Sequence, residues 1–211
     1  YPHFDKHMSD EAIERYVTNP AKVETNSFYP FILYTKKYKQ FDCELARADR
    51  DPKARKIRYA CRRDAYIFEF YRAQISKNYE TELVKRGIEH IPIAYRKLRT
   101  ARGSGKSSID FAKEAFEEII SRGSCIVVTL DISKYFENLD HAKIYQLWSQ
   151  LLSQPKLPRD HLAVFKAITR YVEVDRDLAY ERLGIIGALS GTSRKGFLRK
   201  RADISTQLCT P

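Results

Sequence analysis

The chain has 211 residues, of which 43% are hydrophobic and 12% aromatic, so it can bury one sizeable core, or one domain and part of a second. Its 38 lysines and arginines against 27 acidic residues give a net charge of +11, and a protein this basic is expected to bind a polyanion such as nucleic acid. The sequence contains no apolar span of ~20 residues, no Cys-x-x-Cys pair and no ligand-spaced histidines, so we expect a soluble, cytoplasmic protein without a disulfide framework or a zinc site.

Residues 1–50 are expected to hold one helix and one extended segment. The stretch 9–20 begins with Ser9 as N-cap and ends at Pro20, with apolar side chains at helical spacing in between, which predicts a short helix. The stretch 28–42 is rich in aromatic residues and interrupted by proline, which indicates an extended segment packed against another element.

Two helices are expected in the next part of the chain. From Arg63 to about Lys85, aromatic and aliphatic residues recur at helical spacing, which predicts a long helix whose aromatic side chains belong to the core. An amphipathic pattern from Ser108 to Gly123 predicts a second helix that ends at the glycine.

Residues 124–141, SCIVVTLDISKYFENLDH, carry the strongest functional signal. The β-branched run from Ile126 to Leu130 predicts a strand buried on both faces, so Asp131 would stand at its carboxyl end, where open α/β sheets gather ligands. Asp140 then caps a further helix. A carboxylate at a sheet edge, beside a turn of free backbone N–H groups, can hold a divalent metal ion and the phosphates bound to it.

Positive charge gathers in the stretches 53–63, 95–106 and 192–201, each of which mixes basic residues with aromatic residues or glycine. Three such stretches favour nucleic-acid binding over merely solvated basic faces. The second contains Gly-Lys-Ser, but a phosphate-binding loop would need glycine where Thr100 stands, and a buried strand before it. An ATPase or GTPase loop is therefore not expected.

Three segments together resemble a known family. LDISKYFENLDH resembles motif A of reverse transcriptases, in which an Asp ends a palm strand and an aromatic residue follows five positions later. ARKIRYACRRDAYIFEFY is similar to the fingers motif, and SSIDFAKEAFEEI resembles the helix that the bacterial retron and antiviral, defence-associated branches place before motif A. The match runs from about Phe28 to Leu152.

The resemblance implies an α+β fold in which helix-rich fingers lead into part of a right-hand polymerase palm. The expected segments are 1–50 (N-terminal helix and extended segment), 51–121 (fingers), 122–175 (palm with motif A) and 176–211 (a basic segment).

For the metal site, the resemblance implies that Asp131 is the catalytic residue and coordinates two Mg²⁺ ions, with Mn²⁺ as an alternative. The carbonyl of Ile132 would help to hold the nucleotide-bound ion.

For the nucleotide site, the resemblance implies that the backbone N–H groups of Lys134 and Tyr135 meet the incoming triphosphate. Phe136 would be the steric gate that favours deoxynucleotides over ribonucleotides. Arg55 would stack on the incoming base and reach the α-phosphate, which suits a planar guanidinium. The second fingers cation is left open between Lys53 and its neighbours.

The basic stretches supply the expected contacts to template and product. These nucleic-acid-binding residues are Arg58, Arg62, Arg63, Arg96, Lys97, Arg99, Arg102 and Lys106.

The function implied is that of an RNA-directed DNA polymerase, or part of one, in bacterial anti-phage defence, with an RNA template, nascent DNA and dNTPs as partners. No Tyr-x-Asp-Asp hairpin, Gly-Gln-Gly loop or thumb appears before Pro211, and one aspartate cannot hold two metal ions. Three alternatives are open: the chain is truncated, it is completed by a partner protein or homo-oligomer, or it is a non-catalytic nucleic-acid-binding module with a degenerate polymerase fold. These alternatives stay open at this point.

Overall fold

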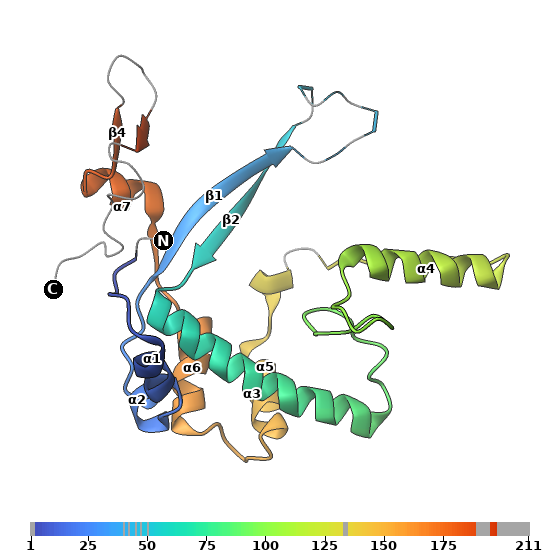
Figure 1. The fold of residues 1–211 in the computed structure, drawn as a ribbon, viewed down its shortest axis with the longest axis horizontal. Coiled ribbons are helices and arrows are strands. Elements are labelled where there is room, and N and C mark those ends of the chain that lie inside the picture. Colours follow the sequence, from blue (N-terminus) through green and yellow to red (C-terminus); the bar gives the residue numbers. More distant parts are fainter. Residues whose placement is uncertain are drawn as a thin grey trace. The chain divides into compact units, whose positions relative to one another are not determined.

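The computed structural model describes residues 3–39, 41, 43–44, 46, 48–49, 51–132, 135–188 and 195–197. The fold is α+β, as expected: the described residues form helices, a three-stranded sheet and a two-stranded sheet (Figure 1). The helices in these ranges are α1 (Asp10–Val17), α2 (Pro20–Glu24), α3 (Arg62–Arg86), α4 (Ser108–Arg122), α5 (His141–Leu151), α6 (Arg159–Thr169) and α7 (Arg176–Arg182), with a 3-10 helix η1 at Tyr135–Asn138. The strands are β1 (Phe31–Lys39), β2 (Pro52–Tyr59), β3 (Glu173–Asp175), β4 (Ile186–Ala188) and β5 (Lys195–Phe197).

The chain divides into two compact units. The first comprises Tyr1–Ala73 and Leu157–Pro211, and the second comprises Gln74–Lys156. The second unit is thus inserted, along the sequence, between the two parts of the first. In the part of the chain that the structure describes, no helix is both long and apolar enough to cross a membrane.

The helix expected at residues 9–20 is confirmed as α1. The Ser9 hydroxyl accepts a hydrogen bond from the N–H of Ala12 at 3.3 Å, and the apolar face buries Ile13 and Val17. Pro20 ends this stretch but also begins α2, because proline suits the first turn of a helix, where its missing N–H costs nothing.

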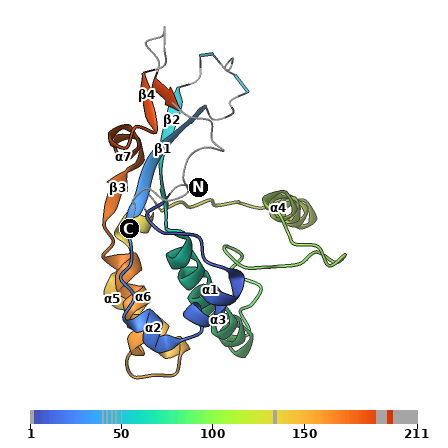
Figure 2. The same ribbon diagram turned by 60° about the vertical axis from the view of Figure 1, so that its left-hand side comes forward.

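Strands β1 and β2 form a long antiparallel ribbon whose register runs from the pair Ile32 and Tyr59 to the pair Lys39 and Pro52 (Figure 1). The expected extended segment is therefore confirmed as β1, which also pairs in parallel with β3 to give the order β2-β1-β3. Figure 2 shows β3 and α7 beside the ribbon.

One hydrophobic cluster of the first unit lies at the base of the ribbon. Ile32 of β1 and Tyr180 of α7 are both buried there, and Phe4, Tyr59, Ile185 and Ile186 pack against them. Burial of these large apolar side chains is the main force holding α7 on the ribbon.

Buried polar groups fasten α3 to this unit. The carboxylate of Asp64 is 1% exposed and accepts hydrogen bonds from the N–H of Tyr29 at 2.8 Å and the side-chain amide of Asn26 at 3.1 Å. Further along α3, the Tyr71 hydroxyl donates to Asp160 of α6 at 2.6 Å. The long helix expected from Arg63 is confirmed.

In the second unit, α4 and α5 form where expected. The first begins with a capping box, in which the hydroxyl of Ser107 accepts from the N–H of Asp110 and the Asp110 carboxylate accepts from the N–H of Ser107. The second is capped by Asp140, which accepts from the N–H of Ala142 at 2.9 Å.

The prediction of a strand at Ile126–Leu130 is wrong. The segment follows α4 as an irregular stretch, and its side chains are exposed: Ile126 by 93% and Leu130 by 88%. A β-branched run favours a strand only where another strand satisfies its N–H and C=O groups, and none of the described strands pairs with it. Asp131 is accordingly not at the end of a central strand.

Candidate nucleic-acid interface

The outer half of the β1–β2 ribbon carries a cationic and aromatic surface. Lys36 lies directly opposite Arg55, and Tyr38 lies directly opposite Lys53. Side chains of opposed residues project from the same face of a sheet, and residues two apart on a strand share a face, so these four form one surface. We call Lys36, Tyr38, Lys53 and Arg55 the tyrosine face.

The tyrosine face is accessible. Its three cations are exposed and Tyr38 is partly so, and the Arg55 guanidinium lies 5.7 Å from the centroid of the Tyr38 ring. Nearer the base of the ribbon the same face is covered, because the Arg176 guanidinium of α7 lies over the Tyr34 ring at 4.5 Å. The open surface is therefore the outer half alone.

The opposite face of the outer ribbon is basic without being aromatic. Lys37 lies opposite Ala54 and Thr35 lies opposite Lys56, and both lysines are exposed. We call Lys37 and Lys56 the lysine face. The two faces carry similar charge but different chemistry.

The tyrosine face suits a nucleotide or a nucleic-acid strand. Lysine and arginine neutralise phosphates, the arginine fork matches phosphate oxygens, and a tyrosine ring offers a surface on which a base can stack. This structure places the expected nucleotide-binding residues Lys53 and Arg55 on one exposed face. Lys36 and Tyr38 on the partner strand were missed, although their alternation with Tyr34 in the sequence is a strand signal.

Three of the expected nucleic-acid-binding cations are engaged within the first unit. Arg58 pairs with Glu173 of β3 at 2.6 Å, and Arg62 approaches Asp5 at 3.8 Å. The Arg63 guanidinium lies over two tyrosine rings and donates to a backbone carbonyl at 2.9 Å. These contacts hold the base of the ribbon and the start of α3 in place.

Arg96 requires a correction. Its side chain is only 6% exposed, and its guanidinium donates to both carboxylate oxygens of Glu80, at 2.8 and 2.6 Å, and to the carbonyl of Pro92 at 2.6 Å. Hydrogen bonding to Arg96 also lowers the pKa of the Glu80 carboxyl. The structure uses this arginine to fasten the loop after α3, so it has few donors left for a phosphate.

The rest of the basic loop is more open. Lys97, Arg99 and Arg102 are exposed, although Arg99 donates to the carbonyl of Gly103 at 2.8 Å and so shapes the turn. Lys106 pairs with Glu114 of α4 at 2.6 Å. Lys97 and Arg102 are the members of this set best placed to meet phosphates.

The expected metal and triphosphate residues belong to the second unit. Asp131 and Ile132 are exposed, Tyr135 is 49% exposed, and Phe136 lies in η1. Lys134 lies outside the described residues. Among the residues that the structure does describe, Asp131 is not part of any cluster of three metal-ligating side chains.

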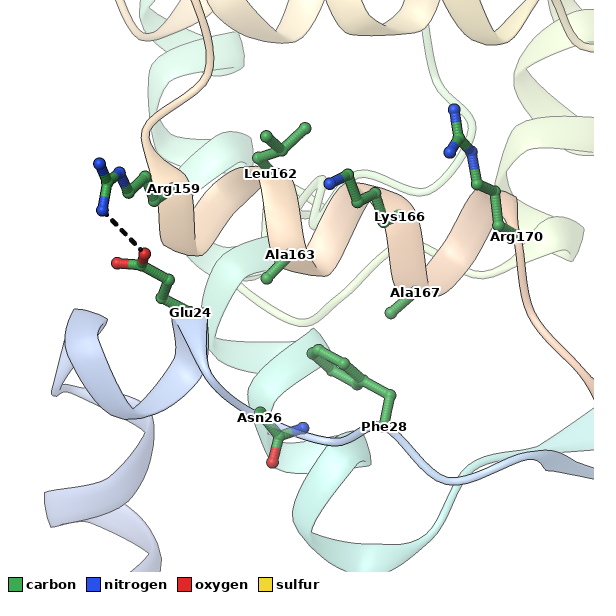
Figure 3. A pocket seen from close by; sticks show the side chains of 9 residues that line it. All are labelled: Glu24, Asn26, Phe28, Arg159, Leu162, Ala163, Lys166, Ala167 and Arg170. Carbon is green, nitrogen blue, oxygen red and sulfur yellow. Dashed lines mark hydrogen bonds and ion pairs between the residues drawn. The ribbon is translucent and has the colours of Figure 1, made fainter.

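A second cationic feature lies on α6. A pocket of about 500 Å³ opens between α6 and the segment after α2 (Figure 3). Ala163 and Ala167 face the Phe28 ring across it, and its lining residues are Glu24, Asn26, Phe28, Arg159, Leu162, Ala163, Lys166, Ala167 and Arg170.

The α6 pocket has a cationic rim that sequence reasoning missed. Arg159, Lys166 and Arg170 recur at helical spacing, which is a signal the sequence does contain. Arg159 is paired at 3.3 Å with Glu24, the carboxylate among the lining residues, and Lys166 and Arg170 also line the pocket. An anionic ligand would meet Lys166 and Arg170 first.

No protein-family model matches this chain, and no curated protein matches it in sequence.

Proposed function

We propose that this chain supplies the fingers and the first half of the palm of an RNA-directed DNA polymerase of the bacterial retron or antiviral, defence-associated type. The observation that carries the proposal is the tyrosine face, on which Lys53 and Arg55 stand together beside Tyr38. The sequence resemblance implies nucleotide binding by Arg55 and leaves the second fingers cation open between Lys53 and its neighbours.

The tyrosine face would bind and orient nucleic acid or an incoming nucleotide. Arg55 offers its guanidinium to phosphate oxygens while its stacking on Tyr38 restricts the side chain to a few orientations. Lys53 and Lys36 add point charges on either side, and these strengthen binding without reading base identity. In this proposal, the protein therefore binds the nucleic acid through its phosphate backbone.

The described residues do not complete a two-metal centre. Two Mg²⁺ ions, or Mn²⁺ in their place, would need several carboxylate oxygens. Of the two residues expected to bind the metal ions, Asp131 and Ile132, only Asp131 has a carboxylate. Catalysis would require at least one further carboxylate beside it. Transfer of a nucleotidyl group from a dNTP to the 3′-hydroxyl of a primer, with release of pyrophosphate, is thus the proposal for the assembled enzyme.

The second candidate is a non-catalytic nucleic-acid-binding module. The observation that favours it is the exposure of Ile126–Leu130, since a palm needs this segment inside a sheet. Both candidates require the tyrosine face to bind nucleic acid, and only the polymerase requires Asp131.

Binding can be tested with two matched double variants. We expect Lys36→Ala/Arg55→Ala to weaken binding of a labelled single-stranded RNA about tenfold or more, and to reduce the slope of log K against log salt by roughly 1–2. Lys37→Ala/Lys56→Ala removes the same charge from the lysine face and should change affinity much less. Fluorescence anisotropy over a salt series measures both quantities. Equal losses in the two variants would show that net charge, and not the tyrosine face, binds RNA.

Catalysis is tested separately by primer extension with dNTPs on an RNA template. In the assembled enzyme, Asp131→Asn should abolish extension while RNA affinity stays unchanged, because asparagine keeps the shape but loses the charge that binds the metal. Extension that survives this substitution would refute the polymerase assignment of Asp131. RNA binding without any extension by the unsubstituted protein would favour the binding module.

A further inference from the structure

Three side chains that are far apart in the sequence meet at the start of α3. A ring nitrogen of His3, a carboxylate oxygen of Asp5 and the sulfur of Cys61 all lie within 4.8 Å of one another. All three residues are buried, with His3 and Cys61 at 0% exposure and Asp5 at 7%. One nitrogen, one oxygen and one sulfur atom, each able to bind a metal ion, therefore lie close together inside the first unit.

The cluster has donor capacity that the protein does not use. Nε2 of His3 and Oδ1 of Asp5 are buried and have no hydrogen-bond partner. An unpaired buried polar atom costs free energy, and native structures seldom leave two of them side by side. Arg62 approaches Oδ1 only to 3.8 Å. The described residues satisfy these two atoms only weakly, through the long Arg62 contact to Oδ1 and the Tyr59 backbone beside the His3 ring.

Backbone N–H groups already orient two of these side chains. The other carboxylate oxygen of Asp5 accepts from the N–H of Arg63 at 2.9 Å, and the Cys61 sulfur accepts from the N–H of Asp64 at 3.4 Å. Both donors belong to the first turn of α3, whose positive end favours anionic groups. Backbone contacts of this kind orient ligands around a metal ion.

We propose that His3, Asp5 and Cys61 bind a zinc ion that fastens the N-terminal segment to the start of α3. Thiolate, imidazole and carboxylate are the donors that Zn²⁺ takes in proteins, whereas Mg²⁺ prefers oxygen ligands alone. Zinc–ligand distances of about 2.0–2.3 Å require the three atoms to draw together by up to about 1.5 Å. Three protein ligands leave a fourth tetrahedral position for water or another donor.

The charges and protons of this site balance. In the metal-free protein, burial raises the pKa of the Cys61 thiol, with the carboxylates of Asp64 and Asp5 adding to the effect, so the sulfur keeps its proton. Binding replaces that proton, which leaves to solvent, and one thiolate and one carboxylate then neutralise the 2+ ion. The imidazole stays neutral, as its lowered pKa favours, chiefly because of burial.

One existing contact must change on binding. Nδ1 of His3 accepts from the N–H of Phe4 at 2.8 Å, which places the single ring proton on Nε2. Coordination through Nε2 moves this proton to Nδ1 and releases the Phe4 contact. One weak local hydrogen bond is thereby exchanged for a metal bond.

Titration of the tag-free chain with Co²⁺ tests the site directly. We expect saturation at about one ion per chain, with the near-ultraviolet charge-transfer absorption of a thiolate ligand, displacement by Zn²⁺ and none by Mg²⁺. Cys61→Ser should abolish the absorption, while Cys125→Ser, which alters an exposed cysteine, should keep it. No absorption in the unsubstituted chain, or equal absorption in Cys61→Ser, would overturn the proposal.

A second variant guards against misfolding of Cys61→Ser. Asp5→Asn keeps an oxygen to accept from Arg63 but loses the negative charge, so its fold should persist while its Co²⁺ affinity falls about tenfold or more. Zn²⁺ should raise the thermal midpoint of the unsubstituted chain and raise that of Asp5→Asn less. An unchanged affinity and an equal thermal shift in Asp5→Asn would contradict the proposed ligand set.

Discussion

At the scale of single residues, Tyr71 shows how a buried polar group holds two helices together. Its side chain is 2% exposed, and burial together with Asp160 raises the pKa of its hydroxyl. We expect Tyr71→Phe to lower the free energy of unfolding by about 1–3 kcal/mol, because the Asp160 carboxylate loses its donor. Tyr66→Phe, at a position 49% exposed on the same helix, should have almost no effect in urea denaturation. Equal losses at the two positions would contradict this account.

Two buried histidines give the protein a pH dependence of known sign. Burial lowers the pKa of His3 and of His161 below 6.5, so the unfolded chain binds protons more readily than the folded chain does. The free energy of unfolding should therefore fall as the pH drops below about 6.5. In urea denaturation at several pH values, His161→Gln should flatten this dependence. A slope unchanged in His161→Gln would remove this histidine from the explanation.

At the scale of elements, the segment after α4 has a sequence that favours a strand, but its structure is irregular. Val128 is 73% exposed, so Val128→Asp should change the free energy of unfolding of this chain by no more than about 0.5 kcal/mol. A strand buried on both faces would instead lose several kcal/mol on receiving a charge. Urea denaturation distinguishes the two, and a large loss would restore the buried strand.

The helices could be predicted because their signals are local. The caps at Ser9 and Asp140 and the helical spacing after Arg63 lie within a few residues of what they determine. Strand β2 could not be predicted, because the charges of PKARKIRY fall on both of its faces and hide any alternation. Its structure comes from pairing with β1, which is a contact between distant parts of the chain.

The candidate site was predictable in part for the same reason. Basic stretches and a family resemblance pointed to Lys53 and Arg55, but their partners Lys36 and Tyr38 become visible only through the ribbon register. Arg96 looked like a phosphate ligand because composition does not reveal Glu80 beside it. The roles of Asp131 and Phe136 stay predictions.

At the scale of the whole molecule, positive charge is divided between structure and surface. Some cations stabilise the fold through ion pairs and ring contacts, as Arg58 and Arg96 do, and others are exposed on the outer ribbon, the basic loop and α6. A net charge alone could not show which lysines and arginines face solvent. It indicates only that an anionic partner deserves testing.

The discontinuity of the first unit sets the order in which the protein can be built during synthesis. Residues up to Ala73 leave the ribosome first, but β3 and α7, which complete the sheet and cover Ile32, are made only after the whole second unit. The pairing of β1 with β3 closes a long loop and is therefore slow to form. Until then, the edge of β1 that pairs with β3 stays unpaired. During synthesis, Ile32 and the unpaired edge of β1 are therefore exposed for a time to chaperones or to aggregation. Folding of the first unit is complete only when β3 and α7 have been added.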